Sequence, residues 1–225
     1  MLKSGLALIL LGIAQFLIPA PAGIDTWLCR WSGISWIAAG LAYVVGFSSI
    51  FGKRSTGNLQ ALHAILMAPY LVVTWILWFL QTRLSREPVC NEVAPGVWVG
   101  ARCSPKSLPP NLALVVDMTC EIPEDPAIVR RYPYRCVSTL DTAVPNPTAF
   151  REIVELVTVQ DGPVYIHCAL GHGRSATVAV AVLIARKHAA TIDEAIAVVK
   201  AVRPGIKVNA LQRQALETWV SSSLS

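Results

Sequence analysis

The chain has 225 residues, of which 54% are apolar and only 15% charged, and its net charge is +5. Globular domains average roughly 45–50% apolar and about 25% charged residues, whereas the mean hydropathy here is +0.52. These values exclude a disordered or collagen-like chain and argue against a wholly soluble one.

The apolar excess and most of the net charge lie before Pro88. Residues 1–87 carry six basic and two acidic side chains, whereas residues 88–225 carry thirteen and twelve. The basic residues of the first part flank apolar runs, which favours membrane lipids over nucleic acid as a partner. We therefore predict a transmembrane region at residues 1–87 and a separate soluble domain at residues 88–225.

Three apolar stretches predict an all-α transmembrane region of about three helices, near residues 5–20, 33–51 and 61–80. A span needs roughly 20 apolar residues. Tryptophans stand at the ends of the second and third stretches, where their rings are expected at headgroup level. The first stretch has an alternative, because Lys3, a short apolar core and Ala20-Pro21-Ala22 are also typical of a cleaved signal peptide.

Short strands alternate with amphipathic helices after Pro88. Strands are predicted at residues 97–100, 112–118, 134–140 and 163–167 from their bounding Pro and Gly clusters. Helices are predicted at 147–159 behind an Asn146 cap, at 175–187, at 191–203 behind a Thr191 capping box, and at 210–220. This alternation predicts an α/β domain with a mainly parallel central sheet flanked by helices.

The segment from His167 to Ser175 carries the chemistry. A buried strand leads to Cys168, and a seven-residue loop then opens a helix, so that backbone N–H groups and the helix N-terminus form an anion-binding loop. Gly171 and Gly173 suit the tight backbone of such a loop. Arg174 can hold two phosphate oxygens, and the same positive field favours a thiolate at Cys168. The segment therefore predicts a phosphoryl-transfer site that uses no metal or other cofactor.

The pattern His-Cys-x5-Arg-Ser resembles the signature of cysteine-dependent phosphatases, and of their small dual-specificity branch in particular. The resemblance extends over about residues 91–220, with 91–100 similar to the first strand of that family. It implies that Cys168 attacks phosphorus to give a phosphocysteine, that Arg174 binds the transferring oxygens, and that Ser175 stabilises the leaving thiolate. It also implies that His167 orients the loop and lowers the pKa of Cys168. The phosphate-binding loop is then Ala169, Leu170, Gly171, His172, Gly173 and Arg174.

The reaction also needs an acid that protonates the leaving oxygen and then activates water. Family members carry an Asp roughly thirty residues before the cysteine, and Asp141 precedes Cys168 by 27 positions. Asp141 directly follows a predicted strand, as such an acid loop requires. A turn or cap residue is the alternative for Asp141, since Thr142 and Pro145 lie beside it.

Two other interpretations of Cys168 fit less well. A buried structural thiol would not explain why Gly171, Arg174 and Ser175 follow it. A rhodanese-like sulfur transferase also places a cysteine at an anion loop, but His167 and Asp141 argue against it. The other five cysteines show no Cys-x-x-Cys spacing, so we predict no metal site.

Charge leaves the orientation of the membrane region open. With three helices, either orientation places three basic residues inside, which is a tie under the positive-inside rule. Five cysteines in the soluble half, one of them a nucleophile, suit a reducing compartment. We therefore expect a multi-pass membrane protein whose N-terminus lies outside and whose catalytic domain lies in the cytoplasm. Cleavage of the first stretch would reverse that orientation.

The resemblance first implies a protein phosphatase acting on phosphorylated Tyr, Ser or Thr. The alternative is a phospholipid phosphatase of the phosphatidylglycerophosphate type, which the domain also resembles and which tethering at a bilayer would suit; Arg83 and Arg86 would attract anionic headgroups. A third interpretation, of another class, is an inactive module that binds phosphorylated partners. The presence of Cys168, Arg174 and Asp141 gives no reason to prefer it.

Overall fold

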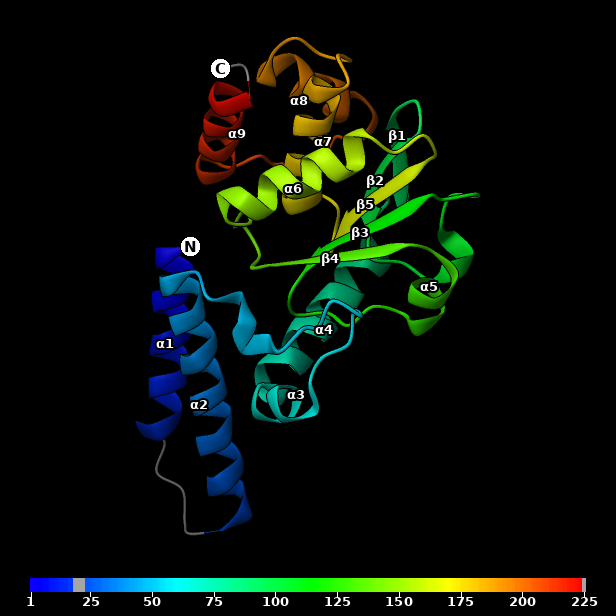
Figure 1. Cartoon of the computed structure of the whole chain (residues 1–225). Helices are drawn as coiled ribbons and strands as arrows, with labels where there is room; N and C mark the ends of the chain where they lie inside the picture. Colours follow the sequence, from blue (N-terminus) through cyan, green and yellow to red (C-terminus); the bar gives the residue numbers. More distant parts are fainter. Residues whose placement is uncertain (18–22, 224–225) are drawn as a thin grey trace.

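The computed structural model describes residues 1–17 and 23–223 (Figure 1). The first part of the chain contains α1 (Leu2–Leu17), α2 (Ile24–Val45), the 3-10 helix η1 (Ser48–Phe51), α3 (Ala61–Leu66) and α4 (Ala68–Leu84). The second part contains β1 (Cys90–Ala94), β2 (Val97–Ala101), the 3-10 helix η2 (Pro105–Ser107), β3 (Leu114–Thr119), α5 (Pro126–Arg131), β4 (Tyr134–Thr139), α6 (Pro147–Thr158), β5 (Val164–Cys168), α7 (Arg174–Ala185), α8 (Ile192–Val202) and α9 (Ala210–Ser223).

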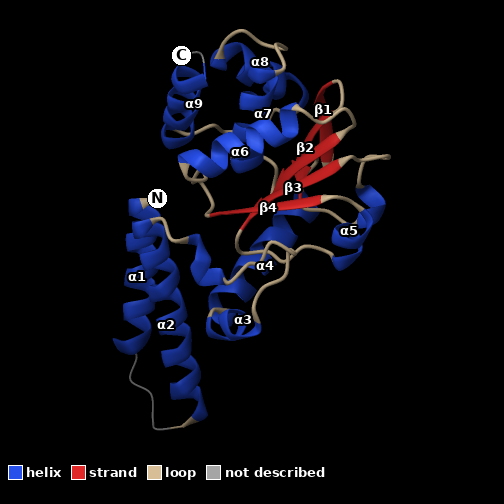
Figure 2. Ribbon diagram, viewed as in Figure 1, coloured by secondary structure: helices blue, strands red, loops and turns tan. Residues whose placement is uncertain are grey.

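A five-stranded sheet in the order β1-β2-β5-β3-β4 forms the centre of the second part (Figure 2). Only the β1–β2 pair is antiparallel, whereas β2–β5, β5–β3 and β3–β4 are parallel. The predicted mainly parallel α/β sheet flanked by helices is thus confirmed. Because β3, β4 and β5 are parallel, their carboxyl ends lie at one edge of the sheet, which is where such folds carry their sites.

The two faces of the sheet are covered differently. The larger core packs α6, α7, α8 and α9 against the face that carries Val99, Val116 and Ile166. The opposite face packs Val115 and Tyr165 against Ile128 of α5 and Leu112. The predicted caps are present, since the Asn146 side chain accepts from the backbone N–H of Ala149 at 2.9 Å and Thr191 accepts from that of Glu194 at 3.2 Å.

Two elements of the second part differ from the sequence-based prediction. The segment 91–100, expected as one strand, is the hairpin of β1 and β2, because Gly96 takes a φ of +73° and turns the chain. The short helix α5 was not predicted, although Asp125 caps it and Pro126 begins it, which is a standard helix-start signal.

Helices α1 and α2 form an antiparallel pair that extends away from the sheet (Figure 1). Glycines lie at the contact, so that a Cβ at Gly12 would approach the Gly33 carbonyl oxygen to 2.6 Å and one at Gly40 would approach that of Gly5 to 2.6 Å. Such close backbone contact through small residues is typical of helices packed in membranes. The motif at residues 20–22, on which the signal-peptide alternative rests, lies outside the described residues.

The predicted spans need correction. The second, expected at 33–51, is α2 at 24–45, which ends where Gly46 takes a left-handed φ of 76°. The third, expected at 61–80, is interrupted at Met67, because Pro69 lacks an N–H and its ring excludes a continuous helix. The first, expected near 5–20, is described as helix from Leu2 to Leu17.

Only the segment Asp25–Val45, among the residues that the structure describes, is both long and apolar enough to cross a membrane. The predicted region of about three spans is therefore not confirmed. Both flanks of the α3–α4 unit contact the sheet domain, since Lys53 precedes it and bonds to Asp117, and Glu87 follows it and accepts from the backbone N–H of Gly205. The α3–α4 unit thus starts and ends beside the sheet domain.

Candidate active site

The cysteine loop joins β5 to α7, as its sequence predicts. Cys168 is the last residue of β5 and Arg174 the first of α7. Gly171 has a φ of +77°, and a Cβ there would collide with the backbone of Gly100 in β2, so this position admits only glycine. Gly173, predicted for the same reason, has a negative φ and instead forms the N-cap of α7.

The thiol of Cys168 is buried and surrounded by groups that favour its ionised form. The backbone N–H of Gly171 donates to Sγ at 3.2 Å, and the Ser175 hydroxyl donates to it at 3.4 Å. Burial by itself would raise the pKa of Cys168, but the Arg174 charge and the Ser175 hydroxyl and N–H outweigh it and hold the pKa below its ordinary value. A thiol whose ionised form is favoured in this way is more reactive than an ordinary buried thiol.

Arg174 is buried and fixed by a carboxylate that sequence reasoning did not identify. Its Nη1 and Nη2 donate to the two oxygens of Glu121 at 3.0 and 2.8 Å, and Nη1 also donates to the Thr139 carbonyl at 2.8 Å. Its Nε has no hydrogen-bond partner among the described residues. Glu121 therefore sets the plane of the guanidinium and leaves one buried donor for an oxyanion.

Asp141 lies just after β4 at the mouth of the same cavity. Its side chain is 62% exposed, and its Oδ1 is 3.4 Å from Nη2 of Arg174. The loop after β4 is held by the start of α9 and the residue before it, because Asn209 Nδ2 donates to the Thr142 carbonyl at 2.8 Å and Gln212 Nε2 to that of Ala143 at 3.2 Å. Asn209 and Gln212 thus contribute to the site. Their contacts with residues 142 and 143 could not be predicted from the sequence.

His167 contacts Glu124 rather than the thiol. Its Nε2 lies 3.0 Å from Glu124 Oε2, and both side chains are buried. Burial alone would lower the pKa of His167, but Asp117 and Glu124 outweigh it and raise that pKa, which favours the protonated ring. Its predicted effect on the pKa of Cys168 stays a prediction, since Arg174 and Ser175 provide the charge and hydrogen bonds at Sγ.

The remaining loop residues are held by side chains from other elements. Arg203 donates from Nε to the Gly171 carbonyl at 2.9 Å and from Nη2 to that of Leu170 at 2.8 Å. His172 lies at the rim, where its Nε2 is 2.6 Å from a carboxylate oxygen of Glu87. The carbonyl of Ala169 accepts from the indole N–H of Trp78 in α4 at 2.9 Å. The loop is therefore fixed on several sides.

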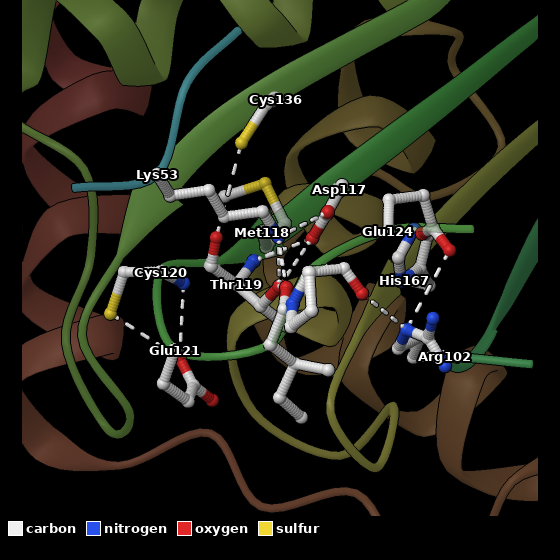
Figure 3. Close-up of polar contacts among 12 residues, drawn as sticks. Lys53, Arg102, Asp117, Met118, Thr119, Cys120, Glu121, Glu124, Cys136 and His167 are labelled. Atoms are coloured by element: carbon white, nitrogen blue, oxygen red, sulfur yellow. Dashed lines mark hydrogen bonds and ion pairs between the residues drawn. The ribbon is translucent and has the colours of Figure 1, made fainter. Parts of the chain in front are cut away.

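A cluster of Asp117, Glu124 and His167 has the donor types of a metal site, with its ligand atoms within 4.8 Å of one another (Figure 3). The ammonium of Lys53 lies 2.5 Å from Asp117 Oδ2, and Arg102 Nε lies 3.6 Å from Glu124. These cations already compensate the two carboxylates. The cluster is therefore a buried charge network behind the cysteine loop.

The cavity above Cys168 has a volume of about 370 Å³. The cysteine loop, Asp141 and Gln212 form one part of its lining. The N-terminal helices form the other part, with Tyr43 from α2 and the α4 residues Tyr70, Thr74, Leu77, Trp78 and Gln81. Residues before Pro88 thus build a wall of the site.

Comparison with known proteins agrees with this geometry. Residues 112–221 match the family described as dual specificity phosphatase, catalytic domain. Solved structures with a similar fold include PTPMT1 in complex with PI(5)P, with a TM-score of 0.54, 21% identity, and coverage of 61% of this chain and 99% of that one. No curated protein matches the chain in sequence.

Two human proteins have a similar fold. The tyrosine phosphatase-like serine/threonine/tyrosine-interacting protein has a TM-score of 0.54, 20% identity, and coverage of 63% and 100%. DUSP28 has a TM-score of 0.51, 19% identity, and coverage of 61% and 97%. Residues 112–221 therefore resemble the catalytic domain of dual-specificity phosphatases, and these solved structures have a similar fold.

Proposed function

We propose that this protein is a membrane-anchored phosphatase that hydrolyses phosphate monoesters through a phosphocysteine intermediate, and that its substrates are phospholipids. One observation carries the proposal. The cavity that contains Cys168 and Arg174 is also lined by apolar and aromatic side chains of α2 and α4.

In the first step the Cys168 thiolate attacks phosphorus, an S–P bond forms, and the ester P–O bond breaks. Asp141 gives its proton to the departing oxygen, so that an alcohol leaves. Arg174, fixed by Glu121, binds the equatorial oxygens with Nε and the guanidinium edge that faces the cavity. This step needs Asp141 protonated and Cys168 ionised.

In the second step water attacks the phosphocysteine. Asp141, now a carboxylate, takes a proton from the water, the S–P bond breaks, and inorganic phosphate forms. The Ser175 hydroxyl, 3.4 Å from Sγ, stabilises the departing thiolate. Asp141 is then protonated again and Cys168 is again a thiolate, as the first step requires.

The apolar surface of α4 beside the cavity supports a lipid substrate. Leu77 lines it and is still 54% exposed, so it joins the site to the apolar surface of α4. Other large apolar side chains on that surface include Val73, Ile76 and Leu80. A phosphate bound at Cys168 would place acyl chains along this surface, where burial contributes about 25 cal/mol per Å². The Arg83 and Arg86 side chains at the end of α4 would attract anionic headgroups.

The test compares kcat/KM for phosphatidylglycerophosphate in mixed micelles with kcat/KM for a phosphotyrosine peptide, with Cys168→Ser as the inactive control. The proposal predicts a large preference for the lipid. Leu77→Ser should lower kcat/KM for the lipid without changing turnover of p-nitrophenyl phosphate. Val159→Ser, at a 71% exposed position at the end of α6 and away from α4, is the control.

The contrary outcomes separate the alternatives. Preference for the peptide would support the protein phosphatase that the sequence first implies. Absence of phosphate release from every substrate, with retained binding, would support a module that holds phosphorylated partners.

We further propose that α1 and α2 enter the bilayer as a hairpin, so that the N-terminus and the catalytic domain lie on the same side. Met1 packs near Leu140 and Ala143 beyond β4. The large apolar side chains of the pair are mostly exposed, as expected for contact with lipid. α2 spans about 33 Å at 1.5 Å per residue, which matches a hydrocarbon core of about 30 Å.

This hairpin would resolve the orientation that charge left open. With α3 and α4 on the catalytic side, the basic residues on that side are Lys3, Lys53, Arg54, Arg83 and Arg86. Only Arg30 lies toward the far end. The positive-inside rule then favours a cytoplasmic catalytic domain. The expected compartment is unchanged, but the N-terminus moves to the cytoplasmic side.

Labelling tests the arrangement. A membrane-impermeant maleimide applied to intact cells should modify Asp25→Cys and leave Ser4→Cys unmodified until the cells are permeabilised. Mass spectrometry assigns the label to the introduced site rather than to native thiols. Modification of Ser4→Cys in intact cells would contradict the hairpin.

A further inference from the structure

Lys53, which precedes the matched phosphatase family region by almost sixty residues, extends its side chain into the catalytic domain. The side chain is 0% exposed. Its Nζ lies 2.5 Å from Asp117 Oδ2, 2.5 Å from Thr119 Oγ1 and 2.6 Å from the Ile122 carbonyl (Figure 3). The ammonium thus uses all three of its donors.

These acceptors lie on one segment, residues 117–124, which comprises the last residues of β3 and the loop that follows the strand. The same segment presents Glu121 to Arg174 and Glu124 to His167. Within it, Asp117 also accepts from the Thr119 N–H at 2.8 Å and from the Tyr134 hydroxyl at 2.6 Å. Lys53 therefore ties the start of this segment to Ile122, the neighbour of Glu121.

A second bond from the N-terminal region reaches the same segment. The indole N–H of Trp75 in α4 donates to the Glu121 main-chain carbonyl at 2.8 Å. The side chain of Glu121 faces Arg174 while its backbone is held from α4. The carboxylate that fixes the guanidinium is thus anchored at two neighbouring peptide groups, by Lys53 and by Trp75.

We propose that Lys53 and Trp75 are positioning residues, through which the N-terminal region orients Arg174 by holding segment 117–124. The proposal rests on the phosphatase activity proposed above. It means that residues 1–87 complete the active site as well as anchoring it.

The physical basis is the cost of burying an ammonium. A buried charge is tolerated only when it is paired and fully hydrogen-bonded. Burial would lower the pKa of Lys53, but Asp117 outweighs it and raises that pKa, so the side chain remains charged. An ammonium of this kind fixes the backbone carbonyl of Ile122 more firmly than water would, because the bond is charge-assisted.

The test separates positioning from a purely structural role. Lys53→Met removes the ammonium that pairs with the buried Asp117 carboxylate and should lower Tm. The double variant Lys53→Met/Asp117→Asn removes both charges and should recover most of that Tm, yet it still lacks the donor to Ile122. We expect kcat for p-nitrophenyl phosphate in the double variant to stay at least ten-fold below wild type, and inhibition by orthovanadate to weaken similarly. Arg54→Met, at the exposed neighbouring position, is the matched control.

Trp75→Phe provides a second measurement should the double variant fail to fold. It keeps an aromatic ring and removes the N–H that bonds Glu121, and we expect kcat and vanadate affinity to fall about three- to ten-fold with little change in Tm. Trp27→Phe, at a 71% exposed position on α2, is its control.

Recovery of wild-type kcat together with Tm in the double variant, or unchanged kcat and vanadate affinity in Trp75→Phe, would overturn the inference. Absence of phosphate release from the wild-type protein would instead contradict the proposed function.

Discussion

The substitution Glu121→Gln perturbs the site at the group that orients Arg174. Wild-type Glu121 accepts from Nη1 and Nη2 at 3.0 and 2.8 Å, and both side chains are almost fully buried. A glutamine keeps one carbonyl acceptor but turns an NH₂ group toward a guanidinium that has no acceptor to offer. One charge-assisted hydrogen bond and the countercharge of Arg174 are therefore lost.

The size of the effect follows from these contacts. A hydrogen bond to a charged group contributes about 1.5–3 kcal/mol, and about 1.4 kcal/mol of barrier corresponds to a ten-fold change in rate. Glu121→Gln should therefore lower kcat by roughly 10- to 100-fold if the lost bond orients Arg174 in the transition state. Breaking a buried ion pair costs about 3–5 kcal/mol of stability, and the acceptor that remains should keep the loss near the lower end.

The assay is kcat for p-nitrophenyl phosphate at saturating substrate, alongside urea unfolding of the same preparations. This ester has a good leaving group, so the first step of its turnover depends on Arg174 and Cys168 and needs little from Asp141 as an acid. Glu152→Gln is the control, because its ion pair with Arg135 is more than half exposed. A loss of stability with kcat within two-fold of wild type would refute the orienting role of Glu121.

Three further outcomes are expected. Cys168→Ser should abolish turnover while still binding phosphate esters, measured by calorimetry, because an alcohol in this loop is a far weaker nucleophile. Asp141→Ala should lower kcat/KM for alkyl phosphates much more than kcat/KM for p-nitrophenyl phosphate; equal losses of kcat/KM would reject Asp141 as the acid. Because the pKa of Cys168 is held below its ordinary value, kcat/KM should rise with pH through an acid limb below the usual thiol range. Ser175→Ala removes a hydroxyl that lowers this pKa and should move the limb to higher pH; an unmoved limb would contradict that role.

The cysteine loop could be predicted because its information is local. Cys168, Arg174 and Ser175 lie within eight residues, and the strand before them and the helix after them fix their geometry. Asp141 could be placed by its distance along the chain and by the strand that precedes it. Its proximity to Arg174 in the structure agrees with that placement.

Glu121 and Lys53 could not be predicted, because their partners are distant in sequence. Glu121 is 53 residues from Arg174, and Lys53 is 64 residues from Asp117. In the sequence Lys53 looks like an ordinary basic residue flanking an apolar run, and only the fold shows that it is buried. The contributions of Trp75 and Trp78 could not be predicted for the same reason. Both are expected at headgroup level from the sequence, but in the structure they donate hydrogen bonds to the carbonyls of Glu121 and Ala169.

Two other differences between the predicted and the observed helices have a signal in the sequence. Pro69 within the third apolar stretch is a helix breaker and predicts the interruption at Met67. Glycines seven residues apart, Gly5 with Gly12 and Gly33 with Gly40, lie on one helix face and are typical of a close helix pair. Hydropathy alone does not register either feature, since it averages over the residues that determine how helices break and pack.

Trapping of the covalent intermediate tests whether Cys168 is the nucleophile. Asp141→Ala should form it at a normal rate from p-nitrophenyl phosphate but hydrolyse it slowly, because the base that activates water is missing. Acid quenching followed by peptide mass spectrometry should then show a phosphate adduct on Cys168, and the adduct should be absent from the same protein carrying Cys168→Ser. Phosphate release by the wild-type enzyme with no adduct at Cys168 in Asp141→Ala, or turnover retained by Cys168→Ser, would show that Cys168 is not the nucleophile.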